Sequence, residues 1–265
     1  MDNFISFGGS SIRFRAEGKG VTLIFLHGYL ESLEIWDSFI TDLVRDYRVL
    51  TMDLPGHGQS GVPSAGAGME VMAAAASSVL DHLGIASAVW IGHSMGGYAS
   101  LAQLESDPSR MKGICLFHSH PLADSPLVIE KRKREIHVVE QGQKRLLVMQ
   151  NTPNMFAPQN LVAFEKELEL TRSIARETSD EGVIAALEGL MNRRDRSSIL
   201  SEAGIPCYQI VGRHDQYIAF EEVSLATRLP QSSQRLILEH SGHMGFFEEK
   251  ARCLHGIRQF VSELA

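Results

Sequence analysis

The chain has 265 residues, a length that suits one large α/β domain with room for an insertion. Its formal net charge of −7 argues against nucleic acid or an anionic membrane as a partner. Hydrophobic residues make up 44% of the chain, but no uninterrupted apolar run is long enough to cross a bilayer. With no secretory signal visible at the first residues, the protein is expected to be cytoplasmic and not to bind membranes.

The cysteines limit the chemistry further. Cys115, Cys207 and Cys253 are an odd set without short spacing, which fits neither a disulfide framework nor a zinc site. Cys115 and Cys207 lie in apolar segments and are expected to be small buried side chains. We therefore expect a reducing compartment and no metal.

The first part of the chain alternates apolar runs with helix-spaced segments. A hairpin is expected over 4–7 and 11–15, turned at Gly8-Gly9. Unbroken apolar runs, which suit strands buried on both faces, predict further strands at 21–26, 48–52, 88–91 and 113–117. Apolar residues at helical spacing predict helices over 32–44, 69–83 and 98–107. This alternation indicates a parallel sheet with helices on both faces and right-handed crossovers.

The alternation stops between about 121 and 198. Only helical segments are expected there, at 128–139, 143–149, 161–176 and 180–192. Strands at 205–211 and 235–238 and helices at about 220–229 and 246–264 then restore the pattern. We expect a core of residues 1–120 and 199–265 and a helical lid of residues 121–198.

One motif points to nucleophilic catalysis. The segment Gly92-His93-Ser94-Met95-Gly96-Gly97 follows an apolar run and leads into a helical segment. A serine flanked by glycines at a strand-to-helix turn is the context of a nucleophile elbow, where the glycines leave room for neighbouring chain segments. Ser94 would then project from the sheet at the positive end of a helix.

A serine nucleophile needs a base, and the base needs an orienting acid. His243 lies in a glycine-bounded loop after the last strand, at the edge where open α/β sheets bind ligands; His240 is the rival. Asp215 follows the strand before that and is the expected acid, with Asp124 as the alternative. The predicted catalytic residues are Ser94, Asp215 and His243.

Two backbone N–H groups are expected to form an oxyanion hole. One belongs to Met95, directly after the nucleophile, and the other to Tyr29, in the loop that Gly28 opens. A glycine-rich segment, 53–60, is interpreted as a tight loop held by Asp53 and His57, without a direct catalytic role.

These motifs together resemble the α/β-hydrolase superfamily. The resemblance rests on His27-Gly28, on 53–60, on 92–97, on Gly212-Arg213-His214-Asp215 and on Ser241-Gly242-His243. It implies a mainly parallel eight-stranded sheet with a helical lid after strand 6, the same three catalytic residues and no cofactor. Within the superfamily the chain is similar to single-lid bacterial carboxylesterases and lactonases. Members with an aspartate nucleophile are disfavoured, because the elbow residue is Ser94.

The expected activity is hydrolysis of a small, neutral, fairly apolar carboxylic ester, or of a lactone, through an acyl-enzyme on Ser94. Alternatives are a carbon–carbon bond hydrolase, a lyase or a cofactor-free peroxidase on the same triad, and a hydrolase-like ligand receptor. The basic run 131–134 is interpreted as a solvated helix face, and no lysine or arginine is identified as an anion anchor. The residues expected to line the substrate pocket are Leu30, His118, His120, Met155, Phe156, Tyr217 and Met244.

Overall fold

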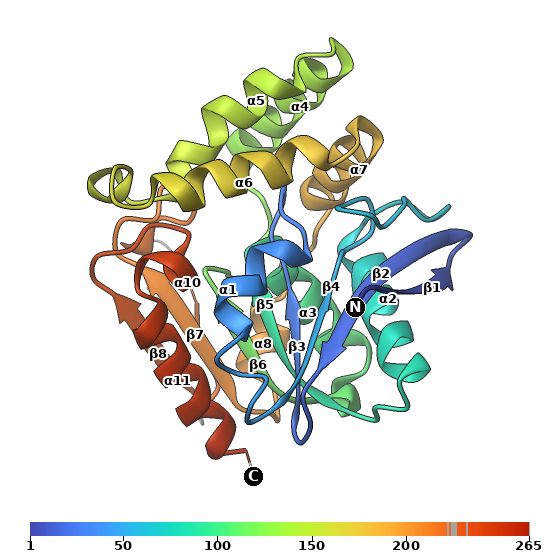
Figure 1. The fold of residues 1–265 in the computed structure, drawn as a ribbon, viewed down its shortest axis with the longest axis vertical. Coiled ribbons are helices and arrows are strands. Elements are labelled where there is room, and N and C mark those ends of the chain that lie inside the picture. Colours follow the sequence, from blue (N-terminus) through green and yellow to red (C-terminus); the bar gives the residue numbers. More distant parts are fainter. Residues whose placement is uncertain (222, 224–226, 232, 265) are drawn as a thin grey trace.

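An eight-stranded sheet runs through the centre of the molecule (Figure 1). The computed structural model describes residues 1–221, 223, 227–231 and 233–264, and within them the strand order is β1-β2-β4-β3-β5-β6-β7-β8. The strands are β1 (Asn3–Phe7), β2 (Ser10–Glu17), β3 (Thr22–Leu26), β4 (Arg48–Met52), β5 (Ala88–His93), β6 (Met111–Phe117), β7 (Cys207–Gly212) and β8 (Gln234–Leu238). The β1–β2 and β2–β4 pairs are antiparallel and all later pairs are parallel. The mainly parallel sheet predicted from the sequence is confirmed.

Helices cover both faces of this sheet because its central strands are apolar on both sides. Alternate residues of β3 point to opposite faces: Ile24 belongs to one apolar cluster and Phe25 to the other. The first cluster is covered by α2 (Met69–His82), α3 (Met95–Ser106) and α8 (Ser197–Ser201), and the second by η1 (Leu33–Trp36), α1 (Asp37–Ile40) and α11 (Lys250–Ser262). A short η2 (Pro108–Arg110) leads into β6.

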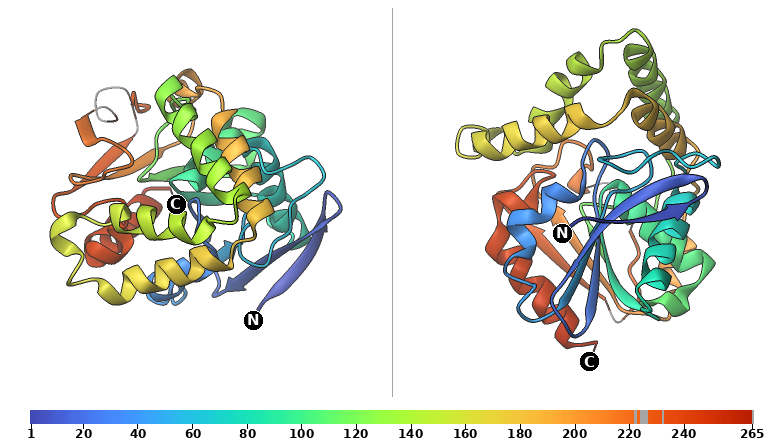
Figure 2. Two further views of the ribbon diagram at one scale, coloured as in Figure 1. Left: turned by 90° about the horizontal axis from the view of Figure 1, so that it is seen from above. Right: turned by 45° about the vertical axis from the view of Figure 1, so that its right-hand side comes forward.

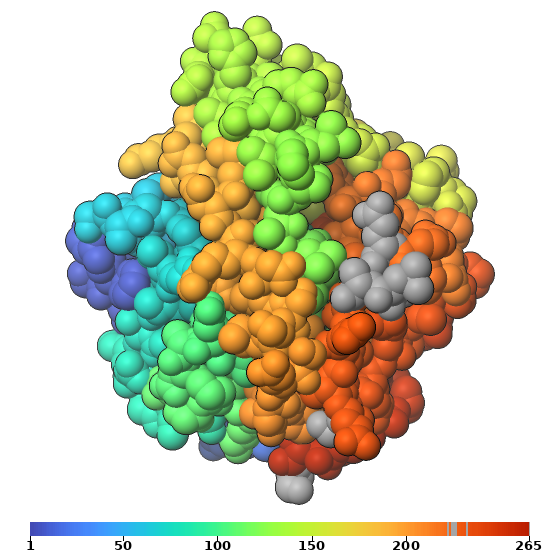
Figure 3. Space-filling view, turned by 180° about the vertical axis from the view of Figure 1, so that it is seen from behind, coloured from blue at the N-terminus to red at the C-terminus, as the bar shows by residue number. Residues whose placement is uncertain are grey.

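A helical insert follows β6 and lies across the carboxyl ends of the parallel strands (Figures 1 and 2). It contains α4 (Pro126–Glu140), α5 (Lys144–Asn151), η3 (Thr152–Met155), η4 (Pro158–Asn160), α6 (Glu165–Glu177) and α7 (Asp180–Met191). Hydrogen bonds join the insert to loops of the core. His243 N, in the loop after β8, donates to Met155 O at 2.7 Å, and Tyr217 Oη, in the loop after β7, donates to Asn151 O at 2.8 Å. Seen from behind, the insert projects above the core (Figure 3). The predicted helical insertion after strand 6 is therefore confirmed.

Two predicted helices are wrong in their extent. The segment 32–44 forms only η1 and α1, since Leu43 N and Val44 N both donate to Ile40 O and turn the chain. The final helix breaks at Glu249 into α10 (Gly245–Glu248) and α11, because the Glu248 and Glu249 carboxylates accept hydrogen bonds from the loop 240–242. The helix predicted at about 220–229 lies partly outside the described residues. None of the helices in the described part of the chain combines the length and the apolar character that a bilayer crossing needs.

Candidate active site

Ser94 occupies a strained turn between β5 and α3. Its backbone has φ 47° and ψ −112°, a conformation that L-residues rarely adopt. The turn is held by the Ser94 N–H, which donates to Phe117 O at 3.0 Å, and by Ser119 Oγ, which donates to Ser94 O at 2.8 Å. A Cβ on Gly96 would lie 2.3 Å from Leu26 O, so this position needs a glycine. The geometry is that of a nucleophile elbow.

The two expected oxyanion donors lie beside this turn. Met95 is the first residue of α3, where N–H groups have no partner within the helix. Tyr29 comes from the loop after β3, in which Leu30 takes a positive φ of 61°. Both residues line the same cavity as Ser94.

His243 and Asp215 form a buried hydrogen-bonded pair. His243 Nδ1 donates to Asp215 Oδ2 at 2.7 Å, and the other carboxylate oxygen accepts from Tyr217 N at 2.9 Å and Ile218 N at 3.0 Å. Burial opposes charge on both groups, but their mutual attraction prevails. It holds the pKa of Asp215 far below its usual range and raises the pKa of His243 above 6.5. Because Nδ1 carries the proton, Nε2 of the neutral ring is free to act as a base.

A second histidine reaches the same carboxylate. His118 Nε2 accepts from Gly245 N at 3.2 Å, so its proton lies on Nδ1, which is 3.4 Å from Asp215 Oδ2. Burial lowers the pKa of His118 to about 4 and keeps the ring neutral. His118, Asp215 and His243 bring possible ligand atoms within 4.8 Å of one another. His243 Nδ1 donates to Asp215 Oδ2, whereas His118 Nδ1 approaches the same oxygen at 3.4 Å and makes no hydrogen bond among the described residues.

The alternative acid and base lie elsewhere. Asp124 is bound by two arginines, with Oδ2 at 2.6 Å from Arg132 Nε and Oδ1 at 2.5 Å from Arg193 Nη1. His240 is exposed, and its backbone N–H donates to Glu249 Oε2 at 2.9 Å. Neither side chain lines the cavity that holds Ser94, as far as the described residues define it.

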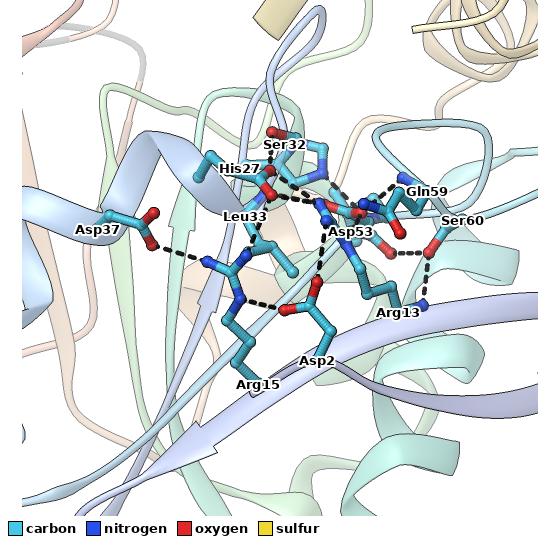
Figure 4. Close-up of polar contacts among 12 residues, drawn as sticks. Asp2, Arg13, Arg15, His27, Ser32, Leu33, Asp37, Asp53, Gln59 and Ser60 are labelled. Atoms are coloured by element: carbon cyan, nitrogen blue, oxygen red, sulfur yellow. Dashed lines mark hydrogen bonds and ion pairs between the residues drawn. The ribbon is translucent and has the colours of Figure 1, made fainter. Parts of the chain in front are cut away.

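The segment 53–60 is organised around Asp53 (Figure 4). This buried carboxylate accepts from Arg13 Nε at 2.6 Å, Leu33 N at 2.8 Å and Gln59 N at 2.8 Å. Ser60 Oγ donates to Asp53 O at 2.8 Å and accepts from Arg13 N at 2.9 Å. These contacts join β2, η1 and the loop after β4, so the Asp53 carboxylate holds three segments of the chain together.

A cavity of about 250 Å³ lies between the catalytic loops and the insert. Ser94 and His243 both line it, together with three of the residues expected from the sequence: Leu30, Met155 and Tyr217. A cavity of this size suits a small substrate.

Four of the expected pocket residues are not among the described residues that line this cavity. His118 lies beneath Asp215, and Met244 is fully buried in the core. Phe156 is fully buried with its ring stacked on Phe247. His120 Nδ1 accepts from Leu122 N at 3.1 Å, and its Nε2 donates to Tyr98 Oη at 3.1 Å, so that Tyr98 faces the cavity instead. The sequence places these residues near strand ends but does not give the direction of their side chains.

One face of α4 lines the cavity and was missed by the sequence interpretation. Val128, Lys131, Arg132 and Glu135 are spaced by three or four residues and share one helix face. The interpretation of 131–134 as a solvated face holds for the exposed Lys131, Lys133 and Arg134 but is wrong for Arg132, whose side chain is 16% exposed. The expectation of a pocket without a cationic residue is wrong, because Lys131 and Arg132 both line the cavity. The i, i+3, i+4, i+7 spacing was visible in the sequence, but the side of α4 that meets the core depends on how the insert docks.

The comparisons with known proteins fit this architecture. A thermophilic esterase from Thermogutta terrifontis, in a malate-bound structure, has a TM-score of 0.93 and 26% identity, covering 100% of this chain and 99% of its own. The enol-lactonase of Burkholderia xenovorans LB400 has a TM-score of 0.90 and 20% identity, covering 98% and 100%. The dihydrolipoyllysine-residue acetyltransferase component of the acetoin cleaving system of Cupriavidus necator is 28% identical over 93% of this chain, which spans 65% of that relative's length. Residues 21–250 match the family described as alpha/beta hydrolase fold, and the chain belongs to this family.

Proposed function

We propose that this protein is a serine hydrolase that cleaves a small carboxylic ester or lactone through an acyl-enzyme on Ser94. The observation that carries the proposal is the hydrogen-bonded pair Asp215–His243, which opens onto the same cavity as Ser94 on its strained turn. The similarity to an esterase at 26% identity supports the class of reaction.

In the first half of the reaction, His243 Nε2 takes the proton of Ser94 Oγ as this oxygen attacks the ester carbonyl carbon. The carbonyl oxygen becomes an oxyanion, which the N–H groups of Tyr29 and Met95 hold by hydrogen bonds. His243 then gives its proton to the leaving oxygen, the carbon–oxygen bond breaks, and the alcohol departs. In a lactone the alcohol stays attached to the acyl group.

In the second half, water replaces the alcohol. His243 takes a proton from water, the resulting hydroxide adds to the acyl carbon, and the same two N–H groups hold the second oxyanion. The bond to Ser94 Oγ breaks as His243 returns the proton to this oxygen, and the acid is released. Asp215 orients the imidazole and stabilises its charged form in both halves. In this proposal residues 121–198 act as the lid over the core of residues 1–120 and 199–265.

The test is hydrolysis of p-nitrophenyl butyrate by the wild-type protein, by Ser94→Ala and by Ser106→Ala. Ser106 is an exposed serine at the far end of α3 and serves as the matched control. Ser94→Ala is expected to lower kcat by at least about 10⁴, as removal of a catalytic serine does in other hydrolases, while Ser106→Ala keeps the wild-type rate. Retention of activity in Ser94→Ala would contradict the proposal.

A further inference from the structure

Part of the cavity lining is polar and cationic. It consists of Tyr29 and of Lys131 and Arg132 of α4, and these three residues are called the cationic wall. We propose that the cationic wall binds a carboxylate of the substrate, so that the esters cleaved at Ser94 are anionic. This inference rests on the proposed function for the reaction and adds the class of substrate.

Charged side chains gather around the cationic wall. Arg132 and Arg193 share the single carboxylate of Asp124, and Lys131 Nζ lies 3.8 Å from Glu135 Oε1. Among these five side chains three positive charges meet two negative charges, while the buried Glu31 carboxylate also lines the cavity and the Asp215 carboxylate lies against His243. The side chains of Arg132, Arg193 and Asp124 are 16%, 3% and 3% exposed, so water and salt screen their charges weakly. The positive charges on the cavity lining itself are those of Lys131 and Arg132.

The Tyr29 hydroxyl is a second, independent observation. It is buried and has no hydrogen-bond partner among the described residues. Buried hydroxyl groups are nearly always hydrogen-bonded, and Tyr29 lines the cavity, so a ligand atom that reaches this enclosed oxygen after a small shift of the lining would satisfy it. Burial, helped by the charge on Glu135, raises the pKa of Tyr29 well above 10 and keeps its proton in place. The hydroxyl therefore offers a donor, which an oxygen of a carboxylate would accept.

Lys131 is held loosely in comparison with its neighbour Lys133. Its ammonium lies 5.2 Å from the centre of the Tyr217 ring and reaches Glu135 only at 3.8 Å. Lys133, on another face of α4, makes a 2.7 Å ion pair with Glu130 and does not line the cavity. The two side chains are 53% and 57% exposed, so they differ in direction and not in exposure. Lys133 is thus a matched control for Lys131.

The test compares kcat/KM for anionic and neutral esters of matched length. Monomethyl succinate, glutarate and adipate place the carboxylate on the acyl side, and O-acetyl glycolate and O-acetyl 3-hydroxypropionate place it on the alcohol side. Methyl pentanoate and propyl acetate are neutral references. The proposal predicts a ratio of anionic to neutral kcat/KM above about 10 for at least one anionic ester, as expected for a direct charge contact inside the cavity.

The variants locate the effect. Lys131→Met and Tyr29→Phe, which keeps the backbone N–H of residue 29, should each lower this ratio at least about fivefold. Lys133→Met should leave the ratio unchanged. A preference for neutral esters at every length, or a ratio that Lys131→Met does not change, would overturn the proposal.

A binding experiment separates this inference from the proposed function. Glutarate and adipate are titrated calorimetrically into Ser94→Ala and into Ser94→Ala with Lys131→Met. Stronger binding to the first variant supports the cationic wall, even if the wild-type protein hydrolyses no ester, a result that would contradict the proposed function alone. Equal affinities, or no binding to either variant, would overturn the cationic wall and leave the assignment of Ser94 standing.

Discussion

The Glu31 carboxylate and the His93 imidazole are fully buried and in contact, with Glu31 Oε2 3.0 Å from His93 Nδ1. The same oxygen accepts from Gly28 N at 2.6 Å, and His93 Nε2 donates to His243 O at 2.9 Å. Burial acts to raise the pKa of Glu31, but the charge of His93 and their hydrogen bond hold it below its usual value. This pair connects the oxyanion loop, the elbow and the loop of the expected base.

Removing that carboxylate should affect stability and catalysis together. Glu31→Ala leaves Gly28 N–H and His93 Nδ1 without a partner, and the free energy of unfolding is expected to fall by about 3 kcal/mol, as when a buried pair is broken. The kcat should fall as well, because the loop that carries Tyr29 loses its anchor. Glu31→Gln is the control, since its amide oxygen in the position of Oε2 can still accept from Gly28 N. Urea unfolding and ester hydrolysis measure the two effects, and wild-type values of both in Glu31→Ala would refute this role.

Asp215 and Asp124 accept hydrogen bonds from different side chains, so their asparagine variants are expected to lose different amounts of activity. Asp215→Asn replaces the acceptor of His243 Nδ1–H and permits the wrong tautomer, so kcat is expected to fall by about 10⁴. Asp124→Asn weakens the contacts to Arg132 and Arg193 instead, and its loss of kcat should be at least about a hundredfold smaller. Equal losses in the two variants, measured with p-nitrophenyl butyrate, would show that Asp215 is not the specific partner of the base.

The pH dependence follows from the state of His243. Only the neutral imidazole can accept the Ser94 proton, so kcat/KM must fall as the pH drops below the pKa of His243 in the free protein. Because the Asp215 carboxylate raises this pKa, the midpoint of the acid limb is expected above pH 6.5. A pH-stat assay with methyl butyrate, corrected for the rate of Ser94→Ala, measures the profile. A rate constant that stays level from pH 8 to pH 5 would exclude His243 as the base.

The Asp53 network should matter for folding more than for chemistry. Asp53→Ala leaves the Arg13 guanidinium, whose side chain is 3% exposed, without its closest carboxylate. The free energy of unfolding is expected to fall by about 3–5 kcal/mol. Asp46→Ala, which removes an exposed carboxylate 3.5 Å from Arg258, should cost less than about 1 kcal/mol. An Asp53→Ala protein that unfolds at the wild-type urea concentration would contradict the structural interpretation of this loop.

The sequence predicted those parts of the fold that depend on local pattern. Unbroken apolar runs located the buried strands, and the helical spacing of 121–198 located the insert. The segment 32–44 shows the limit, since its apolar spacing fits a helix but the chain turns after Ile40. Likewise, the break at Glu249 accompanies carboxylates that accept hydrogen bonds from the preceding loop, which no periodicity in 246–264 reveals.

The candidate site divides in the same way. Ser94, Asp215 and His243 each follow a strand, and parallel strands bring their carboxyl ends to one edge, so their location at the same edge was predictable from topology. Which side chains line the cavity depends instead on how the insert docks. Lys131 and Lys133 stand two residues apart in one basic run, yet only Lys131 lines the cavity. That difference is set by the rotation of α4, about which the sequence gives no information.

The most direct measurement is covalent labelling with a fluorophosphonate, followed by mass mapping of the peptides. The account predicts one adduct per chain on Ser94, strong loss of labelling in His243→Ala, which lacks the base, and normal labelling in Ser106→Ala. An adduct at another serine, with Ser94 unmodified in a protein that still hydrolyses esters, would contradict it.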